Sequence, residues 1–258
     1  MADTILRVEK VSQHFEGLIA VNEVSLHADK GEIVGIIGPN GAGKTTLFNA
    51  ITGLTTPTKG RIFYRNLDIT RKKPYEITAL GCARTFQNIR LCNGMTVLDN
   101  VMVGAHCHLK GNILSQIFHT RRHREDEEKA NAKAMEVLKL TGLEAYCYEY
   151  ATSLPYGKQR RLEIARALAA EPTLLLLDEP AAGMNPQETD ELTAFIGEIR
   201  DKFNMTIFLI EHHMDLVMHI SDRIYVLDFG KQIAEGTPEE IQNNQRVIDA
   251  YLGVAEDA

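Results

Sequence analysis

A glycine-rich turn near the start of the chain ends in a lysine and two hydroxyl residues. It reads Gly38-Pro39-Asn40-Gly41-Ala42-Gly43-Lys44-Thr45-Thr46 and matches the pattern G-x-x-x-x-G-K-[ST]. Glycines let the backbone curl so that its amides point at a phosphate chain, and a following helix presents its positive end to the same anion. We therefore expect Lys44 to bridge the β- and γ-phosphates of a nucleotide and the Thr45 hydroxyl to bind Mg²⁺.

Two carboxylates follow an apolar run much later in the chain. Asp178 and Glu179 come directly after Leu174 to Leu177, which has the length of a buried strand. Ligands of doubly wound sheets bind beyond the carboxyl ends of the strands. Asp178 is therefore expected to hold Mg²⁺ through water, and Glu179 to polarise a water that attacks the γ-phosphate.

A histidine and a glutamine complete the predicted hydrolytic site. His212 follows the apolar run Thr206 to Ile210, and we expect it to hydrogen-bond the γ-phosphate. Gln87 lies where the strand-rich part of the chain gives way to helical patterns. We expect Gln87 to contact both the metal and the attacking water, although a glutamine in a loop carries little information by itself.

The elements that must position these groups predict an α/β fold. Strand, glycine turn and helix are expected at Ile33 to Ile37, the phosphate loop and Lys44 to Thr52. Further strands are expected at Ile5 to Val8, Val21 to Ala28, Leu174 to Leu177, Thr206 to Ile210 and Ile224 to Leu227, and a closing helix at Pro238 to Leu252. From about residue 88 to 152, apolar residues with helical spacing replace the strands. The prediction is an α/β core interrupted by a mostly helical insert.

Composition excludes several classes of protein. The chain has 258 residues, a net charge of −7, 44% hydrophobic residues and four cysteines without CxxC spacing, so a disordered or disulfide-stapled chain is excluded. No signal peptide and no run of 18 apolar residues is present. We expect reduced thiols and no membrane span in the chain itself. The acidic balance argues against nucleic-acid binding.

Two other stretches invite a functional interpretation. His106-Cys107-His108 suggests a metal site, but residues at i and i+2 of a helix point about 200° apart and cannot share one ion. Mg²⁺ is therefore the metal that we infer. The charged run from Arg121 to Lys129 is expected to be a solvated helix start or loop, and its acidic half argues against a lipid or nucleic-acid contact.

The order of the motifs resembles that of the ATP-binding subunit of ABC transporters over the whole chain. The order is phosphate loop, Gln87, a signature stretch, Asp178-Glu179, Ala182 to Asn185, and His212. Within that family the chain most closely resembles the ATPases of bacterial branched-chain amino-acid importers. The residues that carry this likeness are Gly81 to Leu91, the insert Gly111 to Arg124, Ala181 to Pro186, Ile210 to His212, and Ala250 to Gly253.

The resemblance implies a fold and a division into parts. A P-loop NTPase core, with a mixed sheet, flanking helices and an N-terminal antiparallel β part, is expected over residues 1–87 and 153–258. A helical subdomain is expected over 88–152. The implied cofactors are ATP and Mg²⁺, with Phe15 stacking on the adenine.

The resemblance also implies partners. Two such chains, identical or sister ATPases, would face each other, and Leu154 and Gly157 of one would contact the ATP of the other. Gln87 and the helical subdomain would pass the movement to transmembrane permease subunits, served by a periplasmic or extracellular binding protein. The expected location is cytoplasmic, on the inner face of the cell membrane. No nucleic-acid partner is expected.

The signature stretch departs from the family pattern. The family usually has Leu-Ser-Gly-Gly-Gln, whereas this chain has Leu154-Pro155-Tyr156-Gly157-Lys158. Pro155 lacks the serine hydroxyl and a backbone N–H, and a lost hydrogen bond to a charged group is worth roughly 1.5–3 kcal/mol. We expect a site that binds ATP across subunits with fewer donors. Asn185 also stands where the family often has Asp, and His213 stands where Asp often follows the histidine.

Two alternative functions share the core motifs. One is the ATPase of another ABC membrane machine, such as lipopolysaccharide export. The other is a soluble ABC ATPase that acts on ribosomes or DNA, although such proteins usually carry two cassettes in one chain or a long coiled coil. The insert and the end of the chain favour the amino-acid importer.

Overall fold

The strands that the structure describes form two sheets. The computed structural model describes residues 3–105 and 121–252. One sheet contains β1 (Thr4–Phe15), β2 (Leu18–Asp29), β4 (Lys59–Tyr64) and β5 (Leu67–Asp68). The other contains β3 (Ile33–Ile37), β6 (Cys82–Arg84), β7 (Leu174–Asp178), β8 (Thr206–Ile210), β9 (Arg223–Asp228) and β10 (Lys231–Gly236). Within the described residues, the strand orders are β2-β1-β4-β5 and β10-β9-β3-β8-β7-β6.

The larger sheet is parallel except at one edge. β6, β7, β8, β3 and β9 run parallel, and β10 pairs with β9 in the opposite direction. The smaller sheet is antiparallel throughout. A mixed sheet beside an N-terminal antiparallel part confirms the predicted α/β class. The carboxyl ends of parallel strands all lie on the same side of the sheet. The loops that follow β6, β7, β8 and β3 therefore lie close together there.

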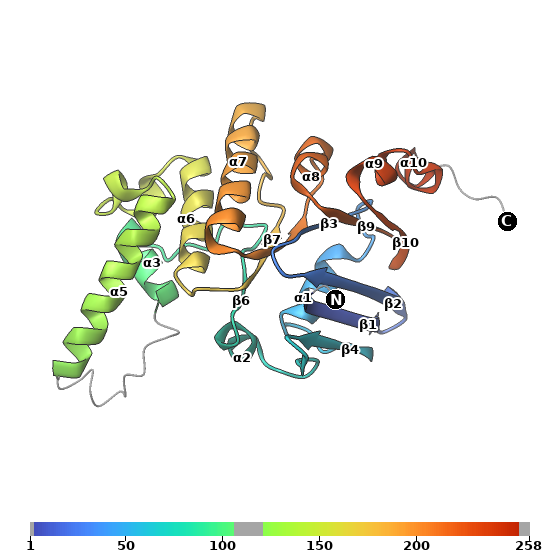
Figure 1. The fold of residues 1–258 in the computed structure, drawn as a ribbon, viewed down its shortest axis with the longest axis horizontal. Coiled ribbons are helices and arrows are strands. Elements are labelled where there is room, and N and C mark those ends of the chain that lie inside the picture. The colour runs from blue at the N-terminus through green and yellow to red at the C-terminus, as the bar shows by residue number, and fades with distance from the viewer. Residues whose placement is uncertain (1–2, 106–120, 253–258) are drawn as a thin grey trace.

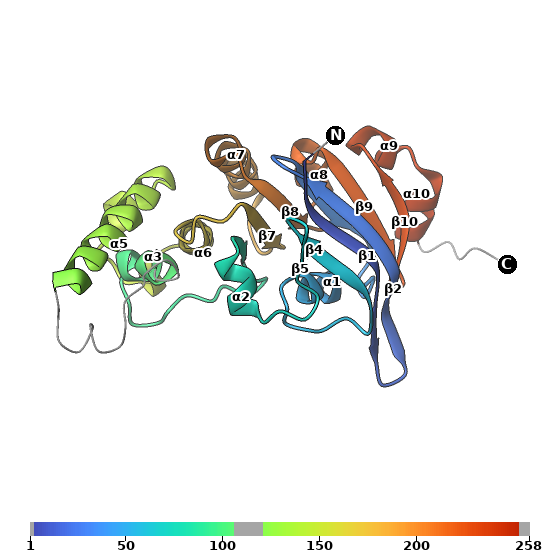
Figure 2. The ribbon, with the colours of Figure 1, turned by 60° about the horizontal axis from the view of Figure 1, so that its bottom comes forward.

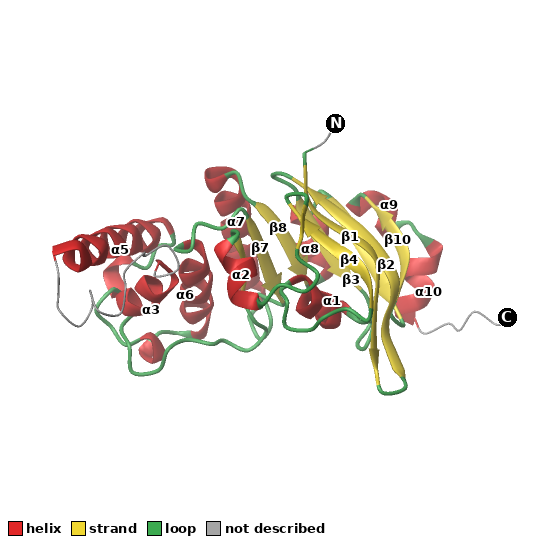
Figure 3. Ribbon diagram, turned by 90° about the horizontal axis from the view of Figure 1, so that it is seen from below, coloured by secondary structure: helices red, strands yellow, loops and turns green. Residues whose placement is uncertain are grey.

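The helices of the described residues either cover the two faces of the larger sheet or lie beyond it. They are α1 (Lys44–Ile51), α2 (Pro74–Ala79), α3 (Val97–Ala105), α5 (Arg121–Leu140), α6 (Tyr156–Leu168), α7 (Pro186–Phe203), α8 (Met214–Ile220), α9 (Pro238–Gln242) and α10 (Gln245–Leu252). Figures 1 and 2 show α3 and α5 at one end of the molecule and α10 at the other. Figure 3 shows the strands of both sheets together, with α3, α5 and α6 beyond them.

Two apolar cores explain why the strands of the larger sheet are continuous hydrophobic runs. On β7, Leu174 and Leu176 pack in one core with α1 and the antiparallel sheet. Leu175 and Leu177 pack in the other core with residues of α6, α7 and α8. Successive side chains of a strand point to opposite faces, so a strand covered on both faces must be apolar at every position.

Some elements differ from the sequence-based expectation. β4, β5, β6, β10 and α2 were not predicted, because they are short or half-exposed and carry little periodicity. The single closing helix expected at Pro238 to Leu252 was wrong. The chain forms α9 and α10 instead, because the Asn244 side chain accepts the Arg246 N–H at 3.0 Å and caps a new helix.

Parts of two predictions lie outside the described residues. His106-Cys107-His108 and most of the insert Gly111 to Arg124 are among them. In the segments that the structure covers, no helix combines the length and the apolar character needed to cross a bilayer. Within the same segments, no group of three or more His, Cys, Asp or Glu side chains is arranged to hold a metal ion.

The Phe208 side chain tests how much the core at β8 contributes to stability. Its ring is fully buried and lies 5.9 Å, centroid to centroid, from that of Phe48 on α1. Phe208→Ala is expected to lower the free energy of unfolding by about 3–5 kcal/mol, because it leaves a cavity between sheet and helix. The matched control is Phe229→Ala, whose side chain is 87% exposed, with an expected change within about 0.5 kcal/mol. Equal losses in urea denaturation would contradict this assignment of the core.

Candidate active site

The candidate site lies where four neighbouring parallel strands end. The glycine-rich loop follows β3, His212 follows β8, and Asp178 and Glu179 are at the end of β7. Gln87 follows β6 by three residues. Since β8 lies between β3 and β7, and β6 lies beside β7, the strand order brings all these groups to the same edge of the sheet.

The glycine-rich loop is held by its own lysine and by a neighbouring strand. Lys44 Nζ donates to the carbonyl oxygens of Gly38 at 2.7 Å and Pro39 at 2.9 Å. Gly43 has φ 97°, and a Cβ built there would lie 2.3 Å from the carbonyl oxygen of Ala20. Only glycine fits this position, because a side chain would meet both the strained φ and the backbone of β2.

The lysine and the two acids lie close enough to interact electrostatically. Burial lowers the pKa of Lys44, and the nearby carboxylates of Glu179 and Asp178 oppose that shift. Burial acts in this direction because it disfavours the charged ammonium, whereas nearby negative charges favour it. The arrangement places one cation among two anions at the point where a triphosphate is predicted to bind.

Glu179 is in direct contact with the other two predicted catalytic side chains. Gln87 Nε2 donates to Glu179 Oε2 at 2.6 Å, and His212 Nε2 lies 2.9 Å from Glu179 Oε1. Glu179 has φ 47°, in the left-handed region, and its N–H donates to Ile210 O at 2.9 Å. Such a backbone conformation costs a non-glycine residue about 1–3 kcal/mol and is often found at functional sites. The geometry holds one carboxylate between an amide and an imidazole.

Arg84 is a part of the site that the sequence did not reveal. Its guanidinium donates to Asp178 Oδ2 at 2.7 Å. From the other nitrogen it donates to Asn49 of α1 at 2.8 Å and to Thr52, the residue that caps the C-terminus of α1, at 3.1 Å. The side chains of Arg84 and Asp178 are 6% and 3% exposed. Arg84 therefore joins α1 to the end of β7 and leaves Asp178 one carboxylate oxygen for other partners. No sequence pattern predicts this pairing across 94 residues.

Glu211 is a second group that the sequence analysis missed. Its buried carboxylate accepts the backbone N–H of Ala181 at 2.7 Å and that of His212 at 2.8 Å. His213 Nδ1 lies 3.1 Å from the same carboxylate. Glu211 thus ties the loop that follows Glu179 to the end of β8. The available signal was an acidic residue directly after a buried strand, which is the same signal that identified Asp178.

The residues predicted to contact the base and the phosphates are accessible. Phe15 is 45% exposed at the end of β1, in the hairpin whose second strand contains Ala20. Thr45 is exposed and Thr46 half-buried at the start of α1, and Asn40 and Gly41 are exposed in the loop. Their stacking and phosphate contacts stay predictions.

The signature stretch forms the start of α6. Pro155 is the N-cap residue, so the helix begins at Tyr156, one residue after the proline. The Leu154 side chain is buried, whereas Gly157 lies against α7, where a Cβ added to the glycine would be 3.4 Å from a carboxylate oxygen of Glu188. Lys158 Nζ lies 4.9 Å from the ring centre of Tyr146. Whether this stretch contacts a second nucleotide stays a prediction.

Asn185 has a structural role in the single chain. Its side chain caps α7 by accepting the N–H of Glu188 at 3.0 Å, and Glu188 returns the contact to the N–H of Asn185 at 3.1 Å. This reciprocal capping box satisfies two backbone donors at the helix start.

Two family models match the chain. The model described as ABC transporter matches residues 21–182, which is more than half of the chain. This chain belongs to the ABC transporter family. A second model, described as branched-chain amino acid ATP-binding cassette transporter, matches residues 231–257. The match confirms the predicted family. This ABC ATPase is an ATP-binding subunit that couples ATP hydrolysis to transport.

Curated relatives of this ABC ATPase match it from end to end. The high-affinity branched-chain amino acid transport ATP-binding protein LivG of Salmonella typhimurium is 48% identical, over 99% of this chain and all of the relative. BraF of Pseudomonas aeruginosa, which has the same description, is 46% identical over the same shares.

Solved structures show the same fold. A crystal structure of the ADP conformation of an ATP-binding cassette of an ABC transporter has a TM-score of 0.84 at 34% identity, covering 97% of this chain and 99% of the other. A dimeric ATP-binding cassette in a post-hydrolysis state, bound to ADP and Pi, has a TM-score of 0.76 at 25% identity and covers 91% of this chain and 99% of the other.

The donor set at the strand ends of this ABC ATPase fits Mg²⁺. Mg²⁺ prefers oxygen ligands and usually keeps several waters beside one or two carboxylates and phosphate oxygens. Asp178 offers the carboxylate oxygen that Arg84 does not contact, and Thr45 offers an exposed hydroxyl. The Gln87 amide oxygen is the third predicted ligand. This set is too small for a dedicated all-protein cage, as expected where a nucleotide supplies the remaining ligands.

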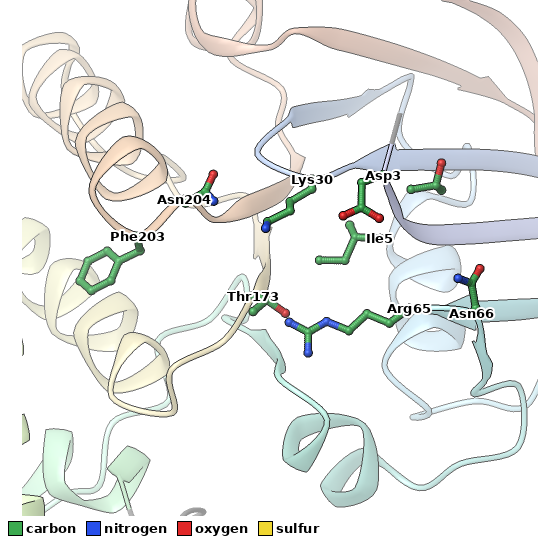
Figure 4. A pocket seen from close by; sticks show the side chains of 9 residues that line it. Asp3, Ile5, Lys30, Arg65, Asn66, Thr173, Phe203 and Asn204 are labelled. Atoms are coloured by element: carbon green, nitrogen blue, oxygen red, sulfur yellow. The ribbon is translucent and has the colours of Figure 1, made fainter. Parts of the chain in front are cut away.

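A cavity of about 410 Å³ lies at the opposite edge of the sheet. Thr173 and Asn204, which precede β7 and β8, line it together with Lys30 and Arg65 (Figure 4). It lies at the amino ends of the parallel strands, away from the glycine-rich loop and the acids. The cavity therefore takes no part in the nucleotide site.

Arg84→Met tests the buried ion pair with Asp178. Removal of one partner leaves an uncompensated buried charge, so the free energy of unfolding is expected to fall by about 3–5 kcal/mol. The second change Asp178→Asn in the same chain is expected to recover part of that loss. Arg7→Met is the matched control, because the side chains of Arg7 and Glu9 are 47% and 46% exposed. Its expected cost is below about 1 kcal/mol. Equal losses for Arg84→Met and Arg7→Met would contradict the proposed weight of the buried pair.

Proposed function

We propose that this chain is the ATP-hydrolysing subunit of an importer for branched-chain or related amino acids, driven by ATP-dependent closure and reopening of a dimer. The observation that carries the hydrolytic part is the contact of Glu179 with both Gln87 and His212 beside Lys44. The substrate class is supported by the C-terminal match at residues 231–257 and by the descriptions of LivG and BraF. The same match favours this function over lipopolysaccharide export.

The side chains divide the work of hydrolysis. Lys44 leaves the carbonyl oxygens of its own loop and binds the β- and γ-phosphates, which offer it a stronger, charged partner. Glu179 accepts a proton from, and orients, the attacking water, while His212 donates to the γ-phosphate. Thr45, Asp178 and Gln87 would hold Mg²⁺, which would supply positive charge to the phosphate oxygens. Phe15 stacks on the adenine.

A second ATPase subunit completes each site in this proposal. Leu154 and Gly157 contribute backbone groups to the nucleotide of the facing chain, which is identical or a sister subunit. The dimeric post-hydrolysis cassette supports such an assembly, since it shares the fold of this chain. Pro155 removes one backbone donor from the contributed stretch, so the facing site has fewer hydrogen bonds to its phosphate.

Transport also requires proteins that this chain does not contain. We infer transmembrane permease subunits that contact the helical part at residues 88–152, and a periplasmic or extracellular binding protein that delivers the amino acid. The chain would then lie on the cytoplasmic face of the membrane. A net charge of −7 supports the absence of a nucleic-acid partner.

An uptake measurement tests the substrate class. Deletion of the gene in its own host is expected to reduce uptake of labelled leucine, isoleucine or valine. The reason is that the permease would lose the ATPase dimer whose closure drives transport. Wild-type protein should restore uptake, whereas a Glu179→Gln variant should bind ATP and fail to restore it. Normal uptake of all three amino acids in the deletion strain would contradict the proposed substrate.

Glu179→Gln also tests the dimer. The variant keeps ATP binding but lacks the carboxylate that activates water, so an ATP-bound dimer is expected to accumulate and to elute at twice the monomer mass in light scattering. The control is Glu179→Gln combined with Lys44→Ala, which removes the phosphate-binding cation and should stay monomeric with ATP and Mg²⁺. A Glu179→Gln protein that stays monomeric at saturating ATP would refute the dimer.

A further inference from the structure

A buried arginine links the signature helix to the segment that carries Gln87. Arg160 on α6 has no exposed surface, and its two terminal nitrogens donate to the carbonyl oxygens of Phe86 and Gln87, both at 2.7 Å. Its charge is paired with Glu163, also buried, at 3.1 Å. Planar guanidinium groups hold two acceptors in a fixed geometry, which lysine cannot do. The backbone at Gln87 is therefore fixed from α6.

A tyrosine extends this link to the loop that follows Glu179. Arg160 also donates to the Tyr156 hydroxyl at 3.2 Å, and that hydroxyl donates to the carbonyl oxygen of Ala182 at 2.9 Å. The Tyr156 ring lies 3.7 Å from the position that a Cβ on Gly183 would take. One hydroxyl thus uses its acceptor toward α6 and its single proton toward the loop.

Together these contacts form a closed circuit of hydrogen bonds and backbone that includes Glu179, the predicted catalytic residue. Gln87 bonds the Glu179 side chain, and Ala182 lies three residues after Glu179 in a turn in which the Ala182 N–H donates to Glu179 O at 3.2 Å. Arg160 and Tyr156 join the two ends. The side chain of Glu179 is thereby held from Gln87 on one side, and its backbone from Ala182 on the other.

We propose that Tyr156 and Arg160 are positioning residues that hold Gln87 and Glu179 at fixed positions relative to the start of α6. A buried ion pair such as Arg160–Glu163 adds little net stability by itself. A contribution to folding stability therefore does not explain why the pair is buried here. The hydrogen bonds of Arg160 to two carbonyl oxygens and to the Tyr156 hydroxyl instead give the pair a positioning role. The first turn of α6 and the hydrolytic carboxylate then move together, which couples the signature stretch to chemistry in the same chain.

The test uses Tyr156→Phe, which removes only the shared hydroxyl. Loss of one hydrogen bond of ordinary strength corresponds to about a three- to tenfold effect. We expect kcat for ATP hydrolysis to fall by about that factor with KM for ATP unchanged, since no residue of the glycine-rich loop is altered. Without nucleotide, hydrogen exchange at the Ala182 and Met184 amides should become faster by a similar factor. Tyr148→Phe, at a side chain that is 81% exposed, is the matched control and should change neither quantity.

A double variant tests whether the two residues act as one unit. Arg160→Lys keeps the charge but loses the forked donor, and Tyr156→Phe combined with Arg160→Lys should reduce kcat no further than the more severe single change. Losses that multiply would overturn the bridge. Unchanged exchange at Ala182 and Met184, or a raised KM with normal kcat, would also overturn it.

The rate measurements rest on the proposed ATP hydrolysis, whereas the exchange measurement is made on the chain without nucleotide. Absence of ATPase activity in the wild-type protein would therefore count against the proposed function. The exchange rates of Tyr156→Phe would still decide the bridge.

Discussion

The proposed hydrolytic site depends on the contact of one carboxylate with two side chains from different strand ends. Glu179 meets Gln87 after β6 and His212 after β8, with hydrogen-bond distances of 2.6 and 2.9 Å. Neither contact is possible unless β6, β7 and β8 are parallel neighbours in that order. The pairing of β7 with β6 on one side and β8 on the other gives this order, and the two apolar cores bury both faces of the sheet.

Buried charged groups lie in or beside the segments that form this contact. Arg84 pairs with Asp178, Arg160 with Glu163, and Glu211 accepts backbone amides. Burying charge is costly unless each group has partners, and each of these groups has at least one charged or backbone partner. Their shared consequence is geometric. Arg84 joins α1 to β7, Glu211 joins the loop after Glu179 to β8, and Arg160 joins α6 to the backbone at Gln87. A site that must respond to a triphosphate is thus built on segments with fixed relative positions.

The signature stretch illustrates how a departure from a family pattern acquires a physical role. Tyr156 stands at a glycine position of the usual pattern, and its hydroxyl connects Arg160 to Ala182. Pro155 precedes the helix as its N-cap and leaves the helix intact. The stretch therefore has contacts within its own chain in addition to those proposed with a facing nucleotide. Asn185 also departs from the family pattern, and it too has a role within its own chain as the cap of α7.

The sequence by itself determined which groups we propose for the chemistry. The glycine spacing before Lys44 and the acids after Leu174–Leu177 are local patterns with a direct physical meaning, and the apolar run before those acids predicted a buried strand of an α/β fold. Only the tertiary structure decided which charges pair, because Arg84 and Asp178 are 94 residues apart and Arg160 bonds carbonyl oxygens that carry no sequence signal. It also decided the short strands β5 and β6 and the break between α9 and α10. Such features depend on partners from distant segments, and local propensity does not encode those partners.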